Sequence, residues 1–288
     1  MKACLSQILL VTIVLMAHSV SGQTNANERA IPIDNLSYPV LITLSDGSSG
    51  SGFYLNTGQS IFLVTAKHVL FDPNTHVLRA LRADVLSYGP TDPTGVKGRN
   101  FGTLDLPVLQ NDGNVIAHQS EDVVVVRISS HHSPVDAKSQ NGISQRVRGF
   151  ELKESTQGGV LTAHMDMVKT FEQVLVGNEV IMYGSPTSLG LQQQKLNLHL
   201  PLLRKGIVAG SNPENRSIIL DCPAYFGNSG GPVLEVDRNG LTTSAYLIGV
   251  VDQYVPFADQ GHANTFVMLS NSGYSIVTPM DFVLELVK

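Results

Sequence analysis

The chain has 288 residues, of which 15% are charged, and its formal net charge is −5 at pH 7. This length suits either two small domains or one two-lobed β unit with a sizeable core. Charges of both signs are dispersed, without a basic block or an acidic tail, which argues against a nucleic-acid-binding surface. Only two cysteines occur, so a disulfide framework is excluded.

The first 22 residues have the features of a secretory signal peptide. Lys2 supplies a positive charge, residues 8–17 form an apolar run, and residues 20–22 offer small side chains before a cleavage point. An uncleaved membrane anchor is the alternative, although the run is short for a bilayer span. Cys4 would leave with the signal, so that the mature chain would carry Cys222 alone. We therefore expect an exported bacterial protein, periplasmic or secreted, without membrane contact after signal removal.

Residues 23–36 are polar and are predicted to form a linker. Beyond them, short runs rich in β-branched residues alternate with turn signals, which is typical of an all-β barrel or sandwich. Residues 131–145 are interpreted as a connection between lobes, and residues 150–175, which show no clear pattern, as an insertion. A closing helix is expected over 279–287, with Thr278 as its N-cap. Strands are expected over residues 38–44, 50–55, 61–65, 82–88, 122–128, 179–184, 196–203, 206–209, 217–221, 232–236, 245–251 and 265–269.

One serine is enclosed by glycines, in the sequence Gly227-Asn228-Ser229-Gly230-Gly231. Glycine allows close approach of the backbone and leaves N–H groups free to point at a ligand. A nucleophilic serine with its own oxyanion hole needs both properties. A serine hydroxyl is also a weak nucleophile at neutral pH, so it requires an imidazole base and a carboxylate that orients the base.

Two residues in the first half of the chain are candidates for that base and that acid. His68 follows the predicted strand 61–65, whose end can hold a side chain rigidly. Asp122 opens the valine-rich run 123–126. Taken alone, His68 would be a structural histidine and Asp122 a turn or cap residue. Their combination with the serine motif favours a catalytic interpretation.

Together these motifs closely resemble those of the trypsin-like (chymotrypsin-fold) serine peptidases, and in particular their bacterial HtrA-type branch. The resemblance covers roughly residues 38–288. It implies an all-β fold of two antiparallel six-stranded β-barrels with a short C-terminal helix and an active site between the barrels. The first barrel would span about residues 37–140 and the second about 141–288. The matching segments are Gly50-Ser51-Gly52-Phe53, Val64-Thr65-Ala66-Lys67-His68-Val69, Asp122 to Ile128, Gly177 to Pro186, and Gly227 to Pro232.

The resemblance also implies a role for each site residue. His68 matches the general base, Asp122 the orienting acid and Ser229 the nucleophile, and the N–H groups of Gly227 and Ser229 match the oxyanion hole. The implied function is an exported serine endopeptidase that hydrolyses protein or peptide substrates through an acyl-enzyme. No cofactor is expected, and no metal, because the sequence has no His-Glu-x-x-His motif and no cysteine pair. The oligomeric state is left open.

Two features of this chain depart from better-known members of that group. Asn228 stands where the disulfide-rich members have an aspartate that pairs with a newly released N-terminus. We therefore expect no trypsin-style zymogen activation. Only 59 residues follow Ser229, so we expect no PDZ module of the kind that HtrA-type proteins usually carry.

Substrate specificity is predicted only in outline. By the same resemblance, Pro223 occupies the place where trypsin-type enzymes keep a carboxylate for Arg or Lys. Small or apolar side chains are therefore expected before the cleaved bond, unless the Asp252 carboxylate faces the pocket. The residues expected to line this pocket are Pro223, Tyr225, Phe226, Val251, Asp252 and Gln253.

Two alternatives stay open. The glycine-serine motif also fits the nucleophile elbow of α/β-hydrolases, which would make the protein a serine esterase, with Asp252 and His262 as partners. That fold needs alternating strands and helices, and it would leave His68 and Asp122 unexplained. The other alternative is a trypsin-like binding protein, inactive or latent until a partner orders the oxyanion loop.

Overall fold

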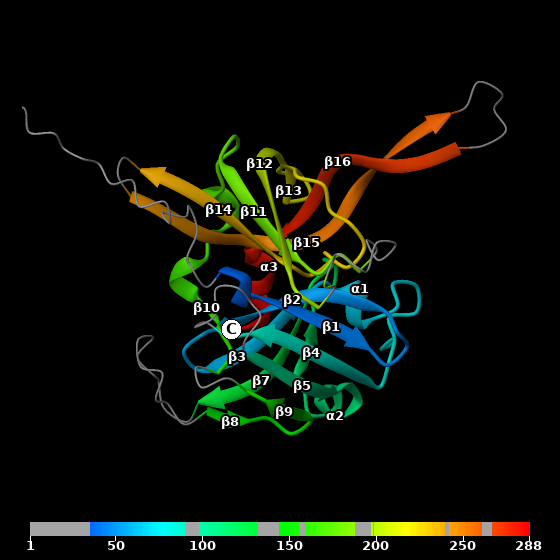
Figure 1. Ribbon diagram of the computed structural model, residues 1–288, viewed down its shortest axis with the longest axis vertical. Coiled ribbons are helices and arrows are strands. Elements are labelled where there is room, and N and C mark those ends of the chain that lie inside the picture. Colours follow the sequence, from blue (N-terminus) through cyan, green and yellow to red (C-terminus); the bar gives the residue numbers. More distant parts are fainter. Residues whose placement is uncertain are drawn as a thin grey trace, which may run out of the picture.

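The structure is a computed structural model that describes residues 35–89, 98–131, 144–155, 159–187, 197, 199–239, 242–260 and 267–288. The chain forms two β-rich lobes (Figure 1), the N-terminal one coloured blue to green and the C-terminal one mostly yellow to red. The expected signal peptide and nearly all of the expected linker lie outside the described residues. In the part that is described, no helix is both long and apolar enough to cross a membrane.

The N-terminal lobe contains ten strands and two short helices among its described residues. The helices are α1 (Lys67–Leu70) and α2 (Leu106–Asn111), and a 3-10 turn, η1 (Asn35–Ser37), precedes the sheet. The strands are β1 (Pro39–Leu44), β2 (Ser49–Asn56), β3 (Ser60–Thr65), β4 (Arg82–Tyr88), β5 (Arg99–Asp105), β6 (Val115–Ala117), β7 (Val124–His131), β8 (Ser144–Arg146), β9 (Phe150–Glu154) and β10 (Ala163–His164). They form one curled sheet in the order β6-β7-β3-β2-β1-β4-β5-β9, with β8 beside β7 and β10 beside β2. All pairs are antiparallel except β10 with β2.

The C-terminal lobe is a closed barrel of six antiparallel strands in the order β11-β12-β13-β16-β15-β14. They are β11 (Glu179–Gly184), β12 (Leu202–Asn212), β13 (Ser217–Asp221), β14 (Pro232–Asn239), β15 (Thr242–Gln260) and β16 (Val267–Pro279). The 3-10 turns η2 (Met165–Met167) and η3 (Phe171–Gln173) lead into the barrel, and helix α3 (Met280–Leu286) follows it. β15 and β16 are long, and their paired ends project from the barrel as an arm (Figure 1).

The expected all-β, two-lobed fold with a short C-terminal helix is confirmed, and two details are corrected. Among the described residues, the N-terminal sheet has ten strands instead of the expected six. Pairing with the N-terminal sheet extends as far as His164, past residue 140, near which the first barrel was expected to end. Thr278 is not an N-cap, because β16 runs on to Pro279, which pairs with Gly249.

Several expectations fall wholly or partly on residues that the structure does not describe. Most of the expected lobe connection, residues 131–145, is among them. The strands expected over 196–203 and 265–269 are described only in part, as β12 from Leu202 and β16 from Val267. His262, a partner in the α/β-hydrolase alternative, also lies outside the described residues.

The valine run at the start of β7 faces two apolar cores. Val124 and Val126 are fully buried in the core of the N-terminal sheet. Val123 and Val125 point the opposite way, as successive residues of a strand do, into a second core between the lobes. Burial of each such side chain contributes about 1.5–3 kcal/mol.

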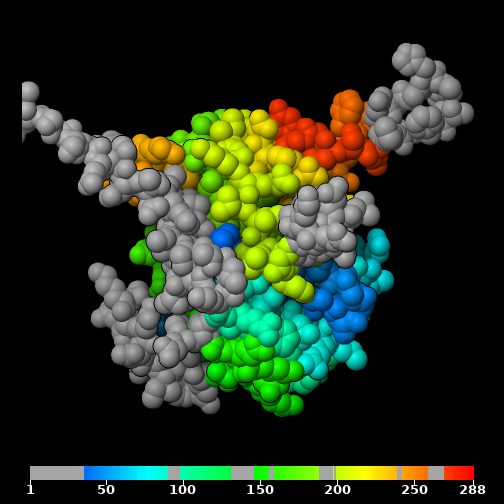
Figure 2. Space-filling model, viewed as in Figure 1, coloured from blue at the N-terminus to red at the C-terminus, as the bar shows by residue number. Residues whose placement is uncertain are grey.

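This second core, which we call the interlobe core, joins strands of both lobes with helix α3. Figure 2 shows the lobes packed against one another on one face of the molecule. Because residues from both lobes share one dry cluster, the lobes are held in a defined relative position. The buried members of the interlobe core are Tyr38, Phe53, Leu55, Phe62, Val64, Val123, Val125, Ala163, Ile181, Tyr183, Leu234, Val236, Leu247, Val250, Met280 and Val283.

Candidate active site

His68 is positioned by a single helical turn that follows β3. This turn, α1, begins at Lys67, and its residues Val69 and Leu70 are buried in the N-terminal core. The anchored turn leaves the His68 side chain at the surface of a cleft, with 33% of it exposed. The expectation that His68 follows the strand directly is therefore met, with the histidine on a rigid support.

Asp122 holds His68 at two atoms. Its Oδ2 lies 2.5 Å from Nδ1 of the His68 ring, and its Oδ1 accepts a hydrogen bond of 2.9 Å from the His68 backbone N–H. Asp122 stands two residues before β7, and the pairing of Val124 with Thr65 brings it alongside the end of β3. In the neutral imidazole, an Nδ1–H that donates to Asp122 leaves Nε2 as the proton acceptor.

The pKa values of this pair are shifted in opposite directions. Burial lowers the pKa of His68, but the hydrogen bond and charge of Asp122, together with the charge of Asp252, outweigh burial and raise it. Burial raises the pKa of Asp122, whereas its hydrogen bonds to His68 and the charge of that ring lower it below its ordinary value. Each group therefore favours the charged form of the other.

Ser229 lies in the loop before β14, at the contact between the lobes. Its backbone carbonyl accepts a hydrogen bond of 2.8 Å from Ser51 N–H of β2, and the next residue, Gly230, donates to the Val251 carbonyl at 2.7 Å. The Ser229 hydroxyl donates to the backbone carbonyl of Asp252 at 3.2 Å. Ser229 and His68 line the same cleft, but within the described residues no hydrogen bond joins their side chains.

The loop before Ser229 has a backbone conformation that only glycine can adopt at one position. Gly227 has φ +98°, and a Cβ at this position would lie 2.3 Å from the Ser185 carbonyl oxygen, so only glycine fits. The Gly227 carbonyl accepts a hydrogen bond of 2.6 Å from the Ser51 hydroxyl, which itself accepts from Ser185 N–H. Within the described residues, neither Gly227 N–H nor Ser229 N–H has a hydrogen-bond partner. Both donors are therefore free to bind an oxyanion.

Asn228 stabilises this loop from within. The residue is almost fully buried, and its Oδ1 accepts a hydrogen bond of 3.0 Å from Tyr225 N–H. The Asn228 N–H donates in turn to the Tyr225 carbonyl at 2.9 Å. The uncharged side chain thus accepts a hydrogen bond inside the loop.

Ser51 is a supporting residue that sequence reasoning missed. Gly50-Ser51-Gly52 belonged to the family resemblance and to the strand expected over residues 50–55, but no role was assigned to the serine. The segment lies within β2, and the buried Ser51 hydroxyl ties the loop before Ser229 to the N-terminal lobe. The signal available in the sequence was a small polar residue between two glycines in an apolar strand.

The residues of the predicted triad open onto a cleft of about 980 Å³. Four of the six predicted pocket residues line it, and two do not. Val251 is fully buried in the C-terminal barrel, because its side chain points inwards. Pro223 does not line the cleft, whereas its neighbour Ala224 does. The lining residues from these two segments are Ala224, Tyr225, Phe226, Gly227, Asp252, Gln253 and Tyr254.

Aromatic side chains form the rim of the cleft beside Ser229. Phe226 is 69% exposed and packs edge to face against Tyr254, with ring centroids 5.8 Å apart. The guanidinium of Arg204 lies over the Tyr225 ring at 4.5 Å. Such exposed aromatic groups provide apolar contact surface for a bound ligand.

Asp252 lies closer to the triad residues than the sequence suggested. Side-chain ligand atoms of His68, Asp122 and Asp252 all lie within 4.8 Å of one another. Among the described residues, this is the one group of three that could hold a metal ion by geometry. Burial, the charge of Asp122 and a hydrogen bond to it raise the pKa of Asp252 to about 7.

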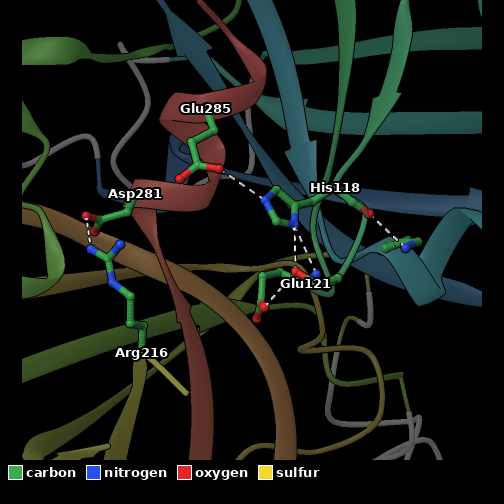
Figure 3. Close-up of polar contacts among 7 residues, drawn as sticks. His118, Glu121, Arg216, Asp281 and Glu285 are labelled. Atoms are coloured by element: carbon green, nitrogen blue, oxygen red, sulfur yellow. Dashed lines mark hydrogen bonds and ion pairs between the residues drawn. The ribbon is translucent and has the colours of Figure 1, made fainter. Parts of the chain in front are cut away.

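Helix α3 supports the loop that carries Asp122 (Figure 3). His118 of this loop lies with Nε2 3.3 Å from a Glu285 carboxylate oxygen, and its Nδ1 accepts a hydrogen bond of 3.0 Å from Glu121 N–H. The other end of the helix contacts the C-terminal barrel through Asp281, which pairs with Arg216 at 2.6 Å. The helix therefore links the barrel that carries Ser229 to the loop before Asp122.

Comparison with known proteins adds a family and a set of structural neighbours. The sequence profile of a family described as trypsin-like peptidase domain matches residues 50–241, which include His68, Asp122 and Ser229. No curated protein sequence matches the chain.

Two solved structures illustrate the neighbours. The serine endoprotease from Yersinia pestis is 15% identical with a TM-score of 0.46, and the match covers 87% of this chain but 61% of that one. Deg5 is 20% identical with a TM-score of 0.47, and the match covers 88% of each chain. The chain thus spans less than two thirds of the Yersinia pestis protein.

Proposed function

Because the chain belongs to the family of trypsin-like peptidase domains, we propose that it is an exported serine endopeptidase with Ser229, His68 and Asp122 as its catalytic triad. The observation that carries the proposal is the double hydrogen bond from Asp122 to His68 in the cleft that Ser229 also lines. This arrangement leaves His68 Nε2 ready to accept a proton next to a serine whose loop carries two free N–H donors.

In the proposed mechanism, the Ser229 hydroxyl first leaves the Asp252 carbonyl and turns towards His68 Nε2. His68 takes the hydroxyl proton while Oγ bonds to the carbonyl carbon of the substrate. The negative charge that develops on the substrate oxygen is stabilised by Gly227 N–H and Ser229 N–H. His68 then protonates the leaving amine, and water hydrolyses the acyl-enzyme with His68 again as the base.

The proposal includes activity without a trypsin-style activating cut. The Asn228 side chain is engaged inside its own loop, with no charge that would need a new N-terminus. We further propose that residues 1–22 direct export, and that the aromatic rim formed by Phe226 and Tyr254 selects small or apolar side chains before the cleaved bond.

The test is covalent labelling of the purified protein by a fluorophosphonate, read by intact mass. We expect one label per chain in the wild type and none in Ser229→Ala or His68→Ala. Ser211→Ala is the matched control, because Ser211 is an exposed serine on β12. A folded wild-type protein that takes no label would contradict the proposal and favour the latent or binding-only alternative. Labelling together with cleavage of esters but not of any peptide in a library would favour the esterase.

A further inference from the structure

Asp252 occupies a β-bulge next to the proposed nucleophile. The pairing of β15 with β16 runs from Val251 opposite Val277 directly to Gln253 opposite Ile276, so Asp252 is the extra residue. A bulge of this kind re-aims a side chain and leaves a backbone group unpaired. Here the side chain of Asp252 faces the cleft, and its carbonyl accepts the hydrogen bond from the Ser229 hydroxyl.

The carboxyl group of Asp252 lies close to that of Asp122, since ligand atoms of Asp252, Asp122 and His68 all lie within 4.8 Å of one another. Two ionised carboxylates at this separation repel one another, so protonation of one member of the pair is favoured. Asp122 already accepts two hydrogen bonds from His68, which favour its ionised form. The proton is therefore held more readily by Asp252, whose pKa is raised to about 7 by burial and by the charge of Asp122.

We propose that Asp252 is a positioning residue of the catalytic site, whose gain or loss of this proton sets the basicity of His68. The proposal rests on the proposed peptidase function. When Asp252 is protonated, its O–H donates to Asp122 and draws negative charge away from the imidazole. When Asp252 releases the proton to solvent, a second negative charge lies beside His68 and favours the imidazolium.

Two other charged groups lie near His68 and Asp252, and neither has the effect on His68 that ionised Asp252 has. On the N-terminal lobe, Arg79 opposes the imidazolium, and its guanidinium donates to the His68 carbonyl at 3.2 Å. Glu121 adds negative charge near Asp252 and favours its protonated form. The pKa of Asp252 is raised to about 7 and the pKa of His68 is also raised, so the protonation of each group depends on that of the other.

The two groups then share protons as a coupled pair. After one proton is lost from the pair, part of the population holds the remaining proton on His68 and cannot accept one from Ser229. The wild-type protein must therefore reach a higher pH for full activity than a variant in which Asp252 is uncharged. If Asp252 had only a structural role, replacing it would not shift the pH profile of activity.

The experiment compares wild type with Asp252→Asn, which keeps a donor for Asp122 but cannot ionise. The titration of His68 is followed by NMR of histidine-labelled protein, and the rate of fluorophosphonate labelling is measured over the same pH range. We expect both His68 titration and the acid limb of labelling to move down by about one pH unit in Asp252→Asn. EDTA is present throughout, because the same three side chains could bind a divalent cation.

Two further variants complete the comparison. Glu121→Gln removes the same charge without touching the His68 ring. We expect it to move the titration of His68 by less than about a third of the shift in Asp252→Asn. Asp252→Ser, a smaller uncharged donor, gives the same comparison if Asn disturbs the bulge.

Two outcomes would overturn the proposal. One is a His68 titration that is unchanged in folded Asp252→Asn and Asp252→Ser, and the other is a shift in Glu121→Gln as large as that in Asp252→Asn. The NMR titration needs no turnover, so failure of this coupling is distinguishable from failure of the peptidase proposal. A shifted His68 titration in a protein that takes no fluorophosphonate label would contradict only the peptidase proposal.

Discussion

Asp122 binds both the ring and the backbone of His68, with its two oxygens on two different atoms of the same residue. The carboxylate thereby fixes the orientation of the imidazole and also the turn that carries it. The arrangement requires two acceptors, one for Nδ1–H and one for the backbone N–H. An amide side chain supplies only one.

We therefore expect Asp122→Asn to fold normally and to lose about 10⁴-fold in kcat for a peptide substrate. Its oxygen would keep the backbone contact, and its NH₂ group would face Nδ1. The ring would then carry its proton on Nε2, where it cannot accept one from Ser229. Steady-state kinetics with circular dichroism as a check on folding measures this. A loss smaller than tenfold would show that Asp122 does not set the tautomer.

Val124→Asp should unfold the protein. Val124 is fully buried in the core of the N-terminal sheet, where a carboxylate would have no partner. An unpaired buried charge costs about 3–5 kcal/mol, which is a large share of the stability of a typical protein. Val77→Asp, at a position 62% exposed, is the control that should melt like wild type. A soluble Val124→Asp protein with an unchanged melting temperature would disprove the assigned core.

The contact of His118 with helix α3 should contribute to both stability and activity. Phe282 of the helix packs edge to face on the His118 ring at 5.2 Å, and Glu285 adds a half-exposed polar contact. We expect His118→Ala to cost about 1–2 kcal/mol, mostly from the ring contact. In a double-mutant cycle with Glu285→Gln, the coupling energy should be about 0.5 kcal/mol. A few-fold loss of kcat should accompany His118→Ala, because the loop before Asp122 loses its support.

Denaturation at several pH values should reveal Asp252. Its pKa is raised to about 7 in the folded protein, against an ordinary value near 4 in the unfolded chain. A raised folded-state pKa contributes stability that is fully present below the unfolded value and is lost as the pH rises through the folded value. Between about pH 4 and pH 7, wild type should thus lose about 1–3 kcal/mol relative to Asp252→Asn. If the free energy of unfolding changed with pH in the same way for both proteins over this range, the raised pKa of Asp252 would be disproved.

The residues that meet in the cleft could be predicted from the sequence because each stands in a short contiguous motif. His68 ends a strand signal, Asp122 opens an apolar run, and Ser229 lies between glycines. The resemblance covers all three, and the structure places them together. The buried strand at the valine run could also be predicted, because a run of apolar residues is a local feature of the sequence.

Other features depend on pairing between distant segments and could not be read locally. The role of Asp252 follows from a bulge in the register of β15 against β16. The membership of β9 in the N-terminal sheet likewise follows from its pairing with β5 and not from a local sequence signal. Val251 was predicted to line the pocket, but its side chain faces the interior of the barrel. Which side of a strand faces the barrel is set by its pairing with neighbouring strands, so the sequence alone did not show it.

The interlobe core means that neither lobe is a domain in the thermodynamic sense. A half-molecule that folded alone would expose a large apolar face, including Phe53, Phe62 and Tyr183. The two lobes therefore stabilise one another, although His68 and Asp122 belong to one lobe and Ser229 to the other. Unfolding of this chain should be all-or-none, and after cleavage between the lobes by a protease neither half should stay folded. The interlobe core that makes the protein one cooperative unit also holds the proposed nucleophile close to the proposed base.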